Sequence, residues 1–163
     1  MMGAMRTLSV EELGRHFASL PGKPRVVVSG NVAVPWAGVR ALDANKDTYT
    51  IHALNAPPGI PDREGVTAET CFVGPGMRRH SDLSYVPSRL SLVPVLLQRR
   101  IPPDVVIVHC APPRDGQLSL GIEVSVLPAA IEGCRQRSGR VVAVINDQMP
   151  YTYGDAQIPV RLE

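Results

Sequence analysis

The stretch Asp104–Cys110 (DVVIVHC) decides the fold of this chain. It is a short, nearly continuous apolar run rich in β-branched residues, which is typical of a strand buried on both faces. Two more runs have the same character, RVVVS at residues 25–29 and RVVAVI at residues 140–145. Strands of this kind occur in parallel sheets that are covered by helices on both sides.

Helical segments alternate with these strands. Ser9 and Glu12 have the spacing of a capping box and predict a helix that continues to about Leu20. Further helices are predicted at about 35–42, 90–100 and 127–137, and further strands at 48–54, 68–73 and 84–86. We therefore predict an α/β fold, a mostly parallel sheet with helices on both faces.

Composition excludes several classes of function. The 163 residues fit one domain, and 17 Lys and Arg against 15 Asp and Glu leave a net charge of +2, which gives no indication of nucleic-acid binding. No apolar run approaches the roughly 18 residues that cross a bilayer, and the N-terminus lacks the apolar core of a signal peptide. The three cysteines lack a CxxC spacing, so we expect no metal and a reduced, cytoplasmic protein.

The chain is rich in turn formers, with 16 Pro and 14 Gly, so we expect long ordered loops. Ligands of parallel sheets bind beyond the carboxyl ends of the strands, and three loops fall there, at 30–31, 112–121 and 146–150. A glycine at position 30 could let backbone N–H groups approach an oxyanion, or could serve a tight turn only. The basic loop at 77–80 could bind phosphate or be solvated.

No complete catalytic set can be assembled from these residues. His109, like His16 and His52, is interpreted as a core histidine, and no histidine pair has metal-ligand spacing. Cys110 is interpreted as a buried thiol rather than a nucleophile. The carboxylates nearest the ligand edge belong to Asp115, Glu123 and Asp147, and the spacing selects none of them as a base.

Two motifs resemble those of a known family. Gly116-x-x-Ser119-x-Gly121 follows the Asp104 strand, and Asn146-x-x-Met149-Pro150 is followed by a glycine four residues later. With the first strand, Gly30 and Pro35, these motifs resemble the N-terminal domain of the acetyl-CoA hydrolase/transferase family. This is a branch of the class I CoA transferases that includes 4-hydroxybutyrate CoA-transferase and succinyl-CoA:acetate CoA-transferase. The resemblance covers about residues 10–160.

The resemblance implies the NagB/RpiA/CoA transferase-like fold and a covalent mechanism in which a glutamate carboxylate attacks the acyl-CoA thioester. Family members have two domains in a chain more than twice this length, and their glutamate lies in the second. We therefore expect residues 1–163 to be a single domain, the N-terminal half of such an enzyme. We expect it to contain no catalytic residue, Glu123 included, and to be inactive alone.

The residues carried over by the resemblance are those of the first-domain loops. They are expected to line the substrate cleft: Gly30, Asn31, Gly116, Ser119, Gly121, Asn146, Met149 and Pro150. The implied substrates are coenzyme A as its acyl thioester and small carboxylic acids, with no tightly bound cofactor.

The implied partner is a C-terminal CoA-transferase domain, in cis or in trans, and an uncovered domain interface would favour homo-oligomers. No nucleic acid and no membrane is expected. The alternative is a non-catalytic module that binds acyl groups or CoA, or that pairs with another subunit. The acid substrate, and the choice between transferase and hydrolase, stay open.

Overall fold

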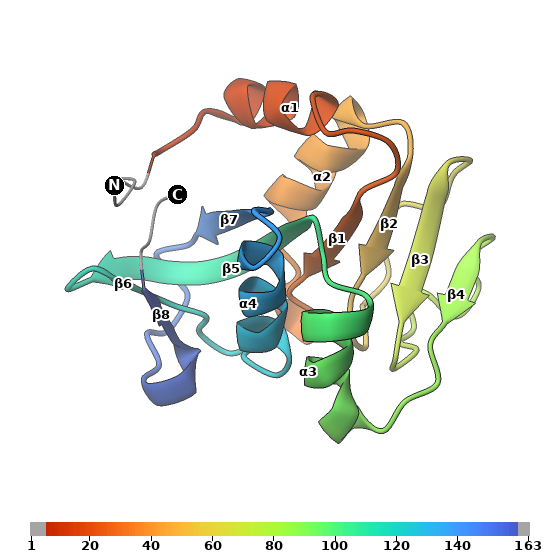
Figure 1. Cartoon of the computed structure of the whole chain (residues 1–163). Coiled ribbons are helices and arrows are strands. Elements are labelled where there is room, and N and C mark those ends of the chain that lie inside the picture. Colours follow the sequence, from red (N-terminus) through yellow and green to blue (C-terminus); the bar gives the residue numbers. More distant parts are fainter. Residues whose placement is uncertain (1–5, 160–163) are drawn as a thin grey trace.

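A parallel sheet with β5 near its centre organises the chain (Figure 1). The computed structural model describes residues 6–159, so both ends of the predicted 1–163 domain lie outside it. Six parallel strands follow the order β4-β3-β2-β1-β5-β7, and two antiparallel strands, β6 and β8, extend the sheet from β5. The strands are β1 Arg25–Val28, β2 Tyr49–His52, β3 Val66–Thr70, β4 Leu83–Tyr85, β5 Val105–Arg114, β6 Gln117–Ser119, β7 Arg140–Ile145 and β8 Gln157–Pro159.

Helices cover both faces of this sheet, as the sequence predicts (Figure 1). On one face lie α1 (Val10–Ala18) and α2 (Trp36–Asn45), which contribute Phe17 and Leu42 to a core shared with Ile107 of β5. On the other face lie α3 (Val93–Val95) and α4 (Leu127–Arg135), with Leu97 and Leu127 packed against Val106. Neighbouring residues of β5 belong to different cores, because alternate side chains of a strand point to opposite faces of the sheet.

The N-terminal helix forms where its capping box predicts. Ser9 Oγ accepts a hydrogen bond from the Glu12 N–H at 3.1 Å, and Glu12 Oε2 accepts one from the Ser9 N–H at 2.9 Å. Two backbone donors that the first turn leaves free are thereby satisfied. Among residues 6–159, no helix combines the length and the apolar character needed to cross a bilayer.

The continuous helix predicted at 90–100 is wrong. The segment divides into a 3₁₀ turn at Leu90–Leu92, the three residues of α3 and a π-helical turn at Leu96–Arg100. Pro94 lies in the middle of the segment and has no N–H to donate, so the α-helical ladder cannot run through it.

The central strand is longer than predicted. β5 continues past Cys110 through Pro112 and Pro113 to Arg114, where it pairs with β6 instead of a parallel neighbour. The register shifts between Ala111 and Arg114, which is where the two prolines lie. Prolines are tolerated in strands at such irregularities because the ladder does not need their N–H. β8, which pairs with β6, has no counterpart in the sequence-based prediction.

A buried ionic cluster joins β1, β2 and β3. Glu69 accepts hydrogen bonds from Arg25 at 3.0 and 3.2 Å, and its Oε1 lies 3.0 Å from His52 Nδ1. His52 is fully buried, as predicted for a core histidine, although its Nε2 has no partner among the described residues. His16, predicted to be similar, is instead only half-buried. Burial alone would raise the pKa of Glu69, but the hydrogen bonds from His52 and Arg25 outweigh burial and lower this pKa.

The Glu69 cluster gives a pH-dependent prediction. Because the folded-state pKa is lowered, Glu69 stabilises the fold above its unfolded pKa of about 4.3 and loses this effect as the pH falls through the folded value. Glu69→Gln should reduce the free energy of unfolding at pH 7 by about 2–4 kcal/mol. This loss is slightly smaller than that from removing one partner of a wholly buried ion pair, because Arg25 is partly exposed. Urea unfolding from pH 7 to pH 3 measures this. A difference from wild type that does not shrink below about pH 4 contradicts it.

Two isoleucines on parallel neighbours provide a matched test of the core. Ile107 is fully buried in β5, whereas Ile145 at the end of β7 is 41% exposed. Ile107→Ala should cost about 2–5 kcal/mol because it leaves a cavity between β5 and α2. Ile145→Ala should cost about 1 kcal/mol or less, as expected for an exposed strand position. Urea titration of both variants checks the prediction, and equal losses would contradict the assignment of β5 as the central strand.

Candidate functional site

The loops beyond the carboxyl ends of β1, β5 and β7 meet at one edge of the sheet, as a parallel arrangement requires. Backbone hydrogen bonds extend the strand ladders into these loops. The Asn31 N–H donates to Leu54 O at 3.1 Å, and the Asn146 N–H donates to Cys110 O at 2.9 Å. The loop backbone is therefore held by the sheet itself.

Asn31 forms the centre of a polar chain at this edge. Its Nδ2 donates to Glu123 Oε2 at 2.5 Å, and its Oδ1 accepts from Asn55 Nδ2 at 2.8 Å. Glu123 is buried, and both asparagines have positive φ, which asparagine tolerates better than most residues. The chain connects loops that follow β1, β2 and β6, and it holds the Asn31 amide in one orientation.

Two glycines allow close packing at this edge. A Cβ at Gly30 would collide with the carbonyl oxygen of Leu54, so the tight-turn interpretation accounts for this glycine without a ligand. Gly121 has φ +64°, and a Cβ there would collide with the Met149 side chain. Met149 is itself buried with Ala33 and other apolar neighbours. The loops that contain Asn31, Gly121 and Met149 are thus packed directly together.

Ser119 connects these loops and does not have the surroundings of a nucleophile. It is fully buried, its Oγ accepts from the N–H groups of Thr152 (2.9 Å) and Gly121 (3.2 Å), and it donates to Thr152 O (2.8 Å). Thr152 Oγ1 donates in turn to Gly121 O at 2.7 Å. The Ser119 hydroxyl therefore holds the segment that follows β6 against the segment that precedes β8.

The remaining predicted cleft residues are placed differently. Asn146 starts the loop after β7, and its Oδ1 accepts from the Gln148 N–H at 2.9 Å, which turns the chain toward Met149 and Pro150. Gly116 lies at the turn between β5 and β6, where an added Cβ would contact nothing within 4 Å, so the structure does not bring it to the other residues.

Asn55 and Thr152 are not among the cleft residues predicted from the sequence. Both complete the hydrogen bonds of the edge, Asn55 through Asn31 and Thr152 through Ser119. Asn55 follows β2 directly, so the rule that ligands bind beyond carboxyl ends could have found it. Thr152 gives no such signal, because its role depends on a pairing between β6 and β8 that the sequence does not reveal.

Other reactive side chains lie outside this network. Cys110 is fully buried, which confirms the interpretation as a buried thiol. Burial raises the pKa of this thiol to about 12, which argues against a nucleophile. His109 is half-buried, and its Nδ1 has no partner among the described residues, so the expected core histidine is not fully satisfied. No cluster of three or more metal-ligating side chains occurs in residues 6–159.

The basic loop at 77–80 borders a cavity of about 390 Å³ between the loops that follow β2 and β3. Arg78 and Arg79 line it together with Asp62 and His80. Asp62 accepts from the Ser81 N–H at 3.1 Å, and His80 Nε2 lies 2.8 Å from Pro61 O. The Asp62 carboxylate thus lines the same cavity as the two arginines, and both hydrogen bonds join the two loops to each other.

Comparison with known proteins identifies the family to which this chain belongs. The sequence model of the acetyl-CoA hydrolase/transferase N-terminal domain matches residues 62–162. The chain is 32% identical to succinyl-CoA:acetate/propanoyl-CoA:succinate CoA transferase of Fasciola hepatica over 87% of its own length and 32% of the relative. It is 31% identical to 4-hydroxybutyrate coenzyme A transferase of Clostridium kluyveri over 83% of the chain and 34% of the relative.

The fold has a solved counterpart. The crystal structure of RipA from Yersinia pestis matches 94% of this chain and 42% of RipA, with a TM-score of 0.76 and 19% identity. The chain belongs to the acetyl-CoA hydrolase/transferase family, of which it contains the N-terminal domain. It spans about a third of the length of the two curated relatives.

Gly121 and Gly116 provide a matched test of the packing at this edge. Both have positive φ, but only a Cβ at Gly121 meets another side chain, that of Met149. Gly116→Ala should cost about 1–2 kcal/mol, because only the backbone conformation is strained. Gly121→Ala should cost about 1–3 kcal/mol more, because Met149 must also move. Urea unfolding measures the difference, and equal losses would contradict the close packing of the two loops.

Proposed function

We propose that this chain is the N-terminal domain of an acyl-CoA:carboxylate CoA-transferase or acetyl-CoA hydrolase, and that it forms one wall of the active-site cleft. The observation that carries the proposal is the match to the family domain together with the two CoA transferases that are 31–32% identical. The substrates on this proposal are acyl-CoA and a small carboxylic acid. The proposal also places the protein in the reducing cytoplasm, and the three buried, unpaired cysteines support this location.

The second part of the proposal is that the remaining catalytic machinery comes from a C-terminal domain. The chain spans 32% and 34% of its curated relatives, so about two thirds of their length has no counterpart in it. The described residues also contain no complete catalytic set. Ser119 has its hydroxyl engaged by backbone groups, and Cys110 has a raised pKa.

Glu123 is the carboxylate at the edge that could be mistaken for the nucleophile. Its Oε2 accepts a short hydrogen bond from Asn31, and the side chain is 7% exposed. We assign it to positioning: it fixes Asn31, which faces the cleft from the loop after β1. The nucleophilic glutamate is then expected in the C-terminal domain, where its carboxylate would attack the thioester carbonyl and release the CoA thiolate.

The wall itself would supply shape and polar groups. Gly30 lets the chain pass close to the Leu54 carbonyl, and Gly121 lets it pass close to the Met149 side chain. The Asn55–Asn31–Glu123 hydrogen bonds hold the two side-chain amides in fixed orientations. Preorganised groups of this kind orient a substrate and stabilise developing charge at little reorganisation cost. Asn31, Gly121 and Met149 are the residues of this wall on which the proposal mainly depends, and Gly116 contributes least.

An alternative is a module that binds CoA or an acyl group, or pairs with another subunit, without catalysis. Its support is that the described residues contain no complete catalytic set: the Ser119 hydroxyl is engaged by backbone groups, and burial raises the pKa of Cys110. Calorimetry with CoA and acetate separates it from the first proposal. Binding to this chain alone, with no turnover after a C-terminal domain is supplied, would favour the module.

Thioester exchange from acetyl-CoA to small acids tests the main proposal. This chain alone should show no turnover above background, and turnover should arise when the C-terminal part of the Clostridium kluyveri relative is added. Asn31→Ala should lower kcat/KM of the mixture by about 10²-fold, because the orientation of the wall is lost.

Gln136→Ala is the matched control for Asn31→Ala. Gln136 is an exposed amide just after α4, near the amino end of β7 and away from the carboxyl ends of the strands. Its loss should leave kcat/KM of the mixture within about twofold of the parent, because a surface substitution away from the cleft changes little. Robust turnover by this chain alone would contradict the assignment of half an enzyme.

A further inference from the structure

The basic loop at 77–80 is a sequence motif that the proposed function does not use. It borders the cavity of about 390 Å³ between the loops that follow β2 and β3. These two loops are packed backbone to backbone, because the Gly76 N–H donates to Ala56 O at 2.8 Å and a Cβ at Gly76 would collide with the Pro57 carbonyl oxygen. The cavity therefore has walls that the protein itself holds in place.

Buried side chains anchor the basic loop at both ends. Met77 is fully buried in the core, and the imidazole of His80 is also fully buried. His80 Nε2 lies 2.8 Å from Pro61 O, and its Nδ1 accepts from the Asp82 N–H at 3.1 Å. A neutral imidazole with its proton on Nε2 satisfies both contacts. The two arginines between these anchors are therefore presented from a fixed backbone.

Arg78 and Arg79 bring two positive charges to the cavity. Both residues are exposed, both line the cavity, and neither pairs with a carboxylate within residues 6–159. Guanidinium groups are planar forks whose N–H groups match the oxygens of a phosphate. The two arginines can therefore bind an oxyanion without first breaking an existing salt bridge.

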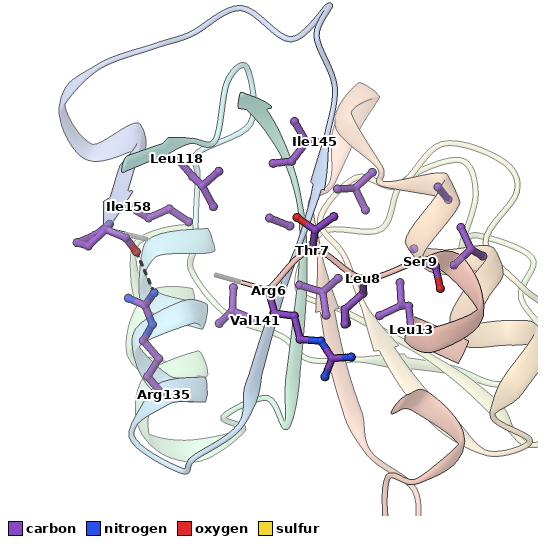
Figure 2. A pocket seen from close by; sticks show the side chains of 17 residues that line it. Arg6, Thr7, Leu8, Ser9, Leu13, Leu118, Arg135, Val141, Ile145 and Ile158 are labelled. Atoms are coloured by element: carbon purple, nitrogen blue, oxygen red, sulfur yellow. Dashed lines mark hydrogen bonds between the residues drawn. The ribbon is translucent and has the colours of Figure 1, made fainter. Parts of the chain in front are cut away.

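Another pocket of about 390 Å³ lies along β7, and its arginines provide a contrast (Figure 2). Arg6 there pairs with Glu12 at 2.7 Å, and Arg135 donates to Pro159 O at 3.2 Å, the bond drawn in Figure 2. The remaining lining of that pocket is mostly apolar. Its arginines are thus held by other protein groups, whereas those of the basic loop have no carboxylate partner within the described residues.

A carboxylate shares the first cavity with the two arginines of the basic loop. Asp62 Oδ1 accepts from the Ser81 N–H at 3.1 Å and from the Ser81 hydroxyl at 2.5 Å, and these hydrogen bonds lower the pKa of Asp62. Because both bonds end on Oδ1, Oδ2 remains an acceptor for a hydroxyl group beside a bound anion. A phosphate next to a hydroxyl, as in a sugar phosphate, therefore complements both the arginines and the carboxylate.

We propose that this cavity binds a ribose phosphate, with Arg78 and Arg79 on the phosphate group and Asp62 on the neighbouring ribose hydroxyl. A volume of about 390 Å³ lies in the range of small-molecule sites, about 300–1,000 Å³, and is many times the roughly 30 Å³ share of one water molecule, so it holds more than a bare phosphate ion. Two sources provide this chemistry, the 3′-phosphorylated ribose of CoA and a free nucleoside monophosphate. The inference rests on the proposed function only for CoA as the source.

The position of the cavity suits CoA as the source. Asn55, at one end of the polar chain in the proposed wall, is three positions before Pro58, which lines the cavity. Three residues of extended chain span at most about 11 Å. CoA carries its 3′-phosphate at the far end from its thiol, beyond the long pantetheine arm. A CoA molecule whose phosphate binds here can therefore reach the wall with its thioester.

Isothermal titration calorimetry of this chain tests the proposal. The probe is adenosine 3′-monophosphate, with adenosine as the ligand that lacks the phosphate and 2′-deoxyadenosine 3′-monophosphate as the ligand that lacks the hydroxyl. Removal of the phosphate should weaken binding by about tenfold or more, and removal of the hydroxyl by about three- to tenfold. CoA should bind more tightly than dephospho-CoA, which lacks the 3′-phosphate, if CoA is the source, and with equal affinity if a free nucleotide is the source.

Two arginine pairs provide a matched control. Arg78→Gln together with Arg79→Gln should weaken binding of adenosine 3′-monophosphate by about tenfold or more. Arg99→Gln together with Arg100→Gln removes the same charge from two exposed neighbours in the π-helical turn, outside the cavity, and should change this affinity by less than about twofold. Asp62→Ala should abolish the preference for the ribose ligand over the deoxyribose ligand, which a merely structural role would leave in place. The urea midpoint of each variant shows whether it folds.

Three results would overturn the proposal. They are failure of adenosine 3′-monophosphate to bind, binding no tighter than that of either analogue, and an equal loss of affinity in both arginine pairs. The comparison of ligands on the parent chain does not depend on any variant. Thioester exchange with the added C-terminal part is measured separately. Turnover without phosphate-dependent binding counts against this inference alone, and phosphate-dependent binding without turnover counts only against the proposed activity.

Discussion

The parallel pairing of β5 with β1 on one side and β7 on the other is the constraint on which the rest of the molecule depends. Parallel neighbours cannot be joined by tight turns, so each pairing requires a crossover segment that covers a face of the sheet. Parallel strands also direct their carboxyl ends to one edge. The covered cores and the position of the Asn31 loop beside the Gly121 and Met149 loops both follow from this geometry.

The sequence was sufficient for features that depend on local pattern. The β-branched runs predicted the central strands, and the spacing of Ser9 and Glu12 predicted the first helix with its cap. Features that depend on distant partners were beyond it. Pro112 does not end β5, because β6 accepts an irregular pairing there, and the Asn31–Glu123 hydrogen bond joins residues 92 positions apart. Period and propensity contain no information about such pairs.

The candidate site and the edge of β7 differ in how completely they are built. At the carboxyl ends of the strands, Asn31, Ser119 and Gly121 have partners within the described residues, so the loops there are held by their own hydrogen bonds. Loops held in this way need little reorganisation. Within residues 6–159, the apolar strand β7 pairs with β5 alone, and Arg6 and Arg135 line the pocket beside it. An apolar edge strand has no such network on its outer side.

The separation of β1 and β5 along the chain has a consequence for synthesis. Val27 and its partner Val106 are 79 positions apart, 106 − 27. At a translation rate of about 5–20 residues per second, roughly 4–16 s pass between the appearance of the two strands. During this interval β1 can pair with β2 but not with the strand that completes its burial. The nascent chain therefore exposes an apolar strand for seconds, an interval in which aggregation can compete with folding.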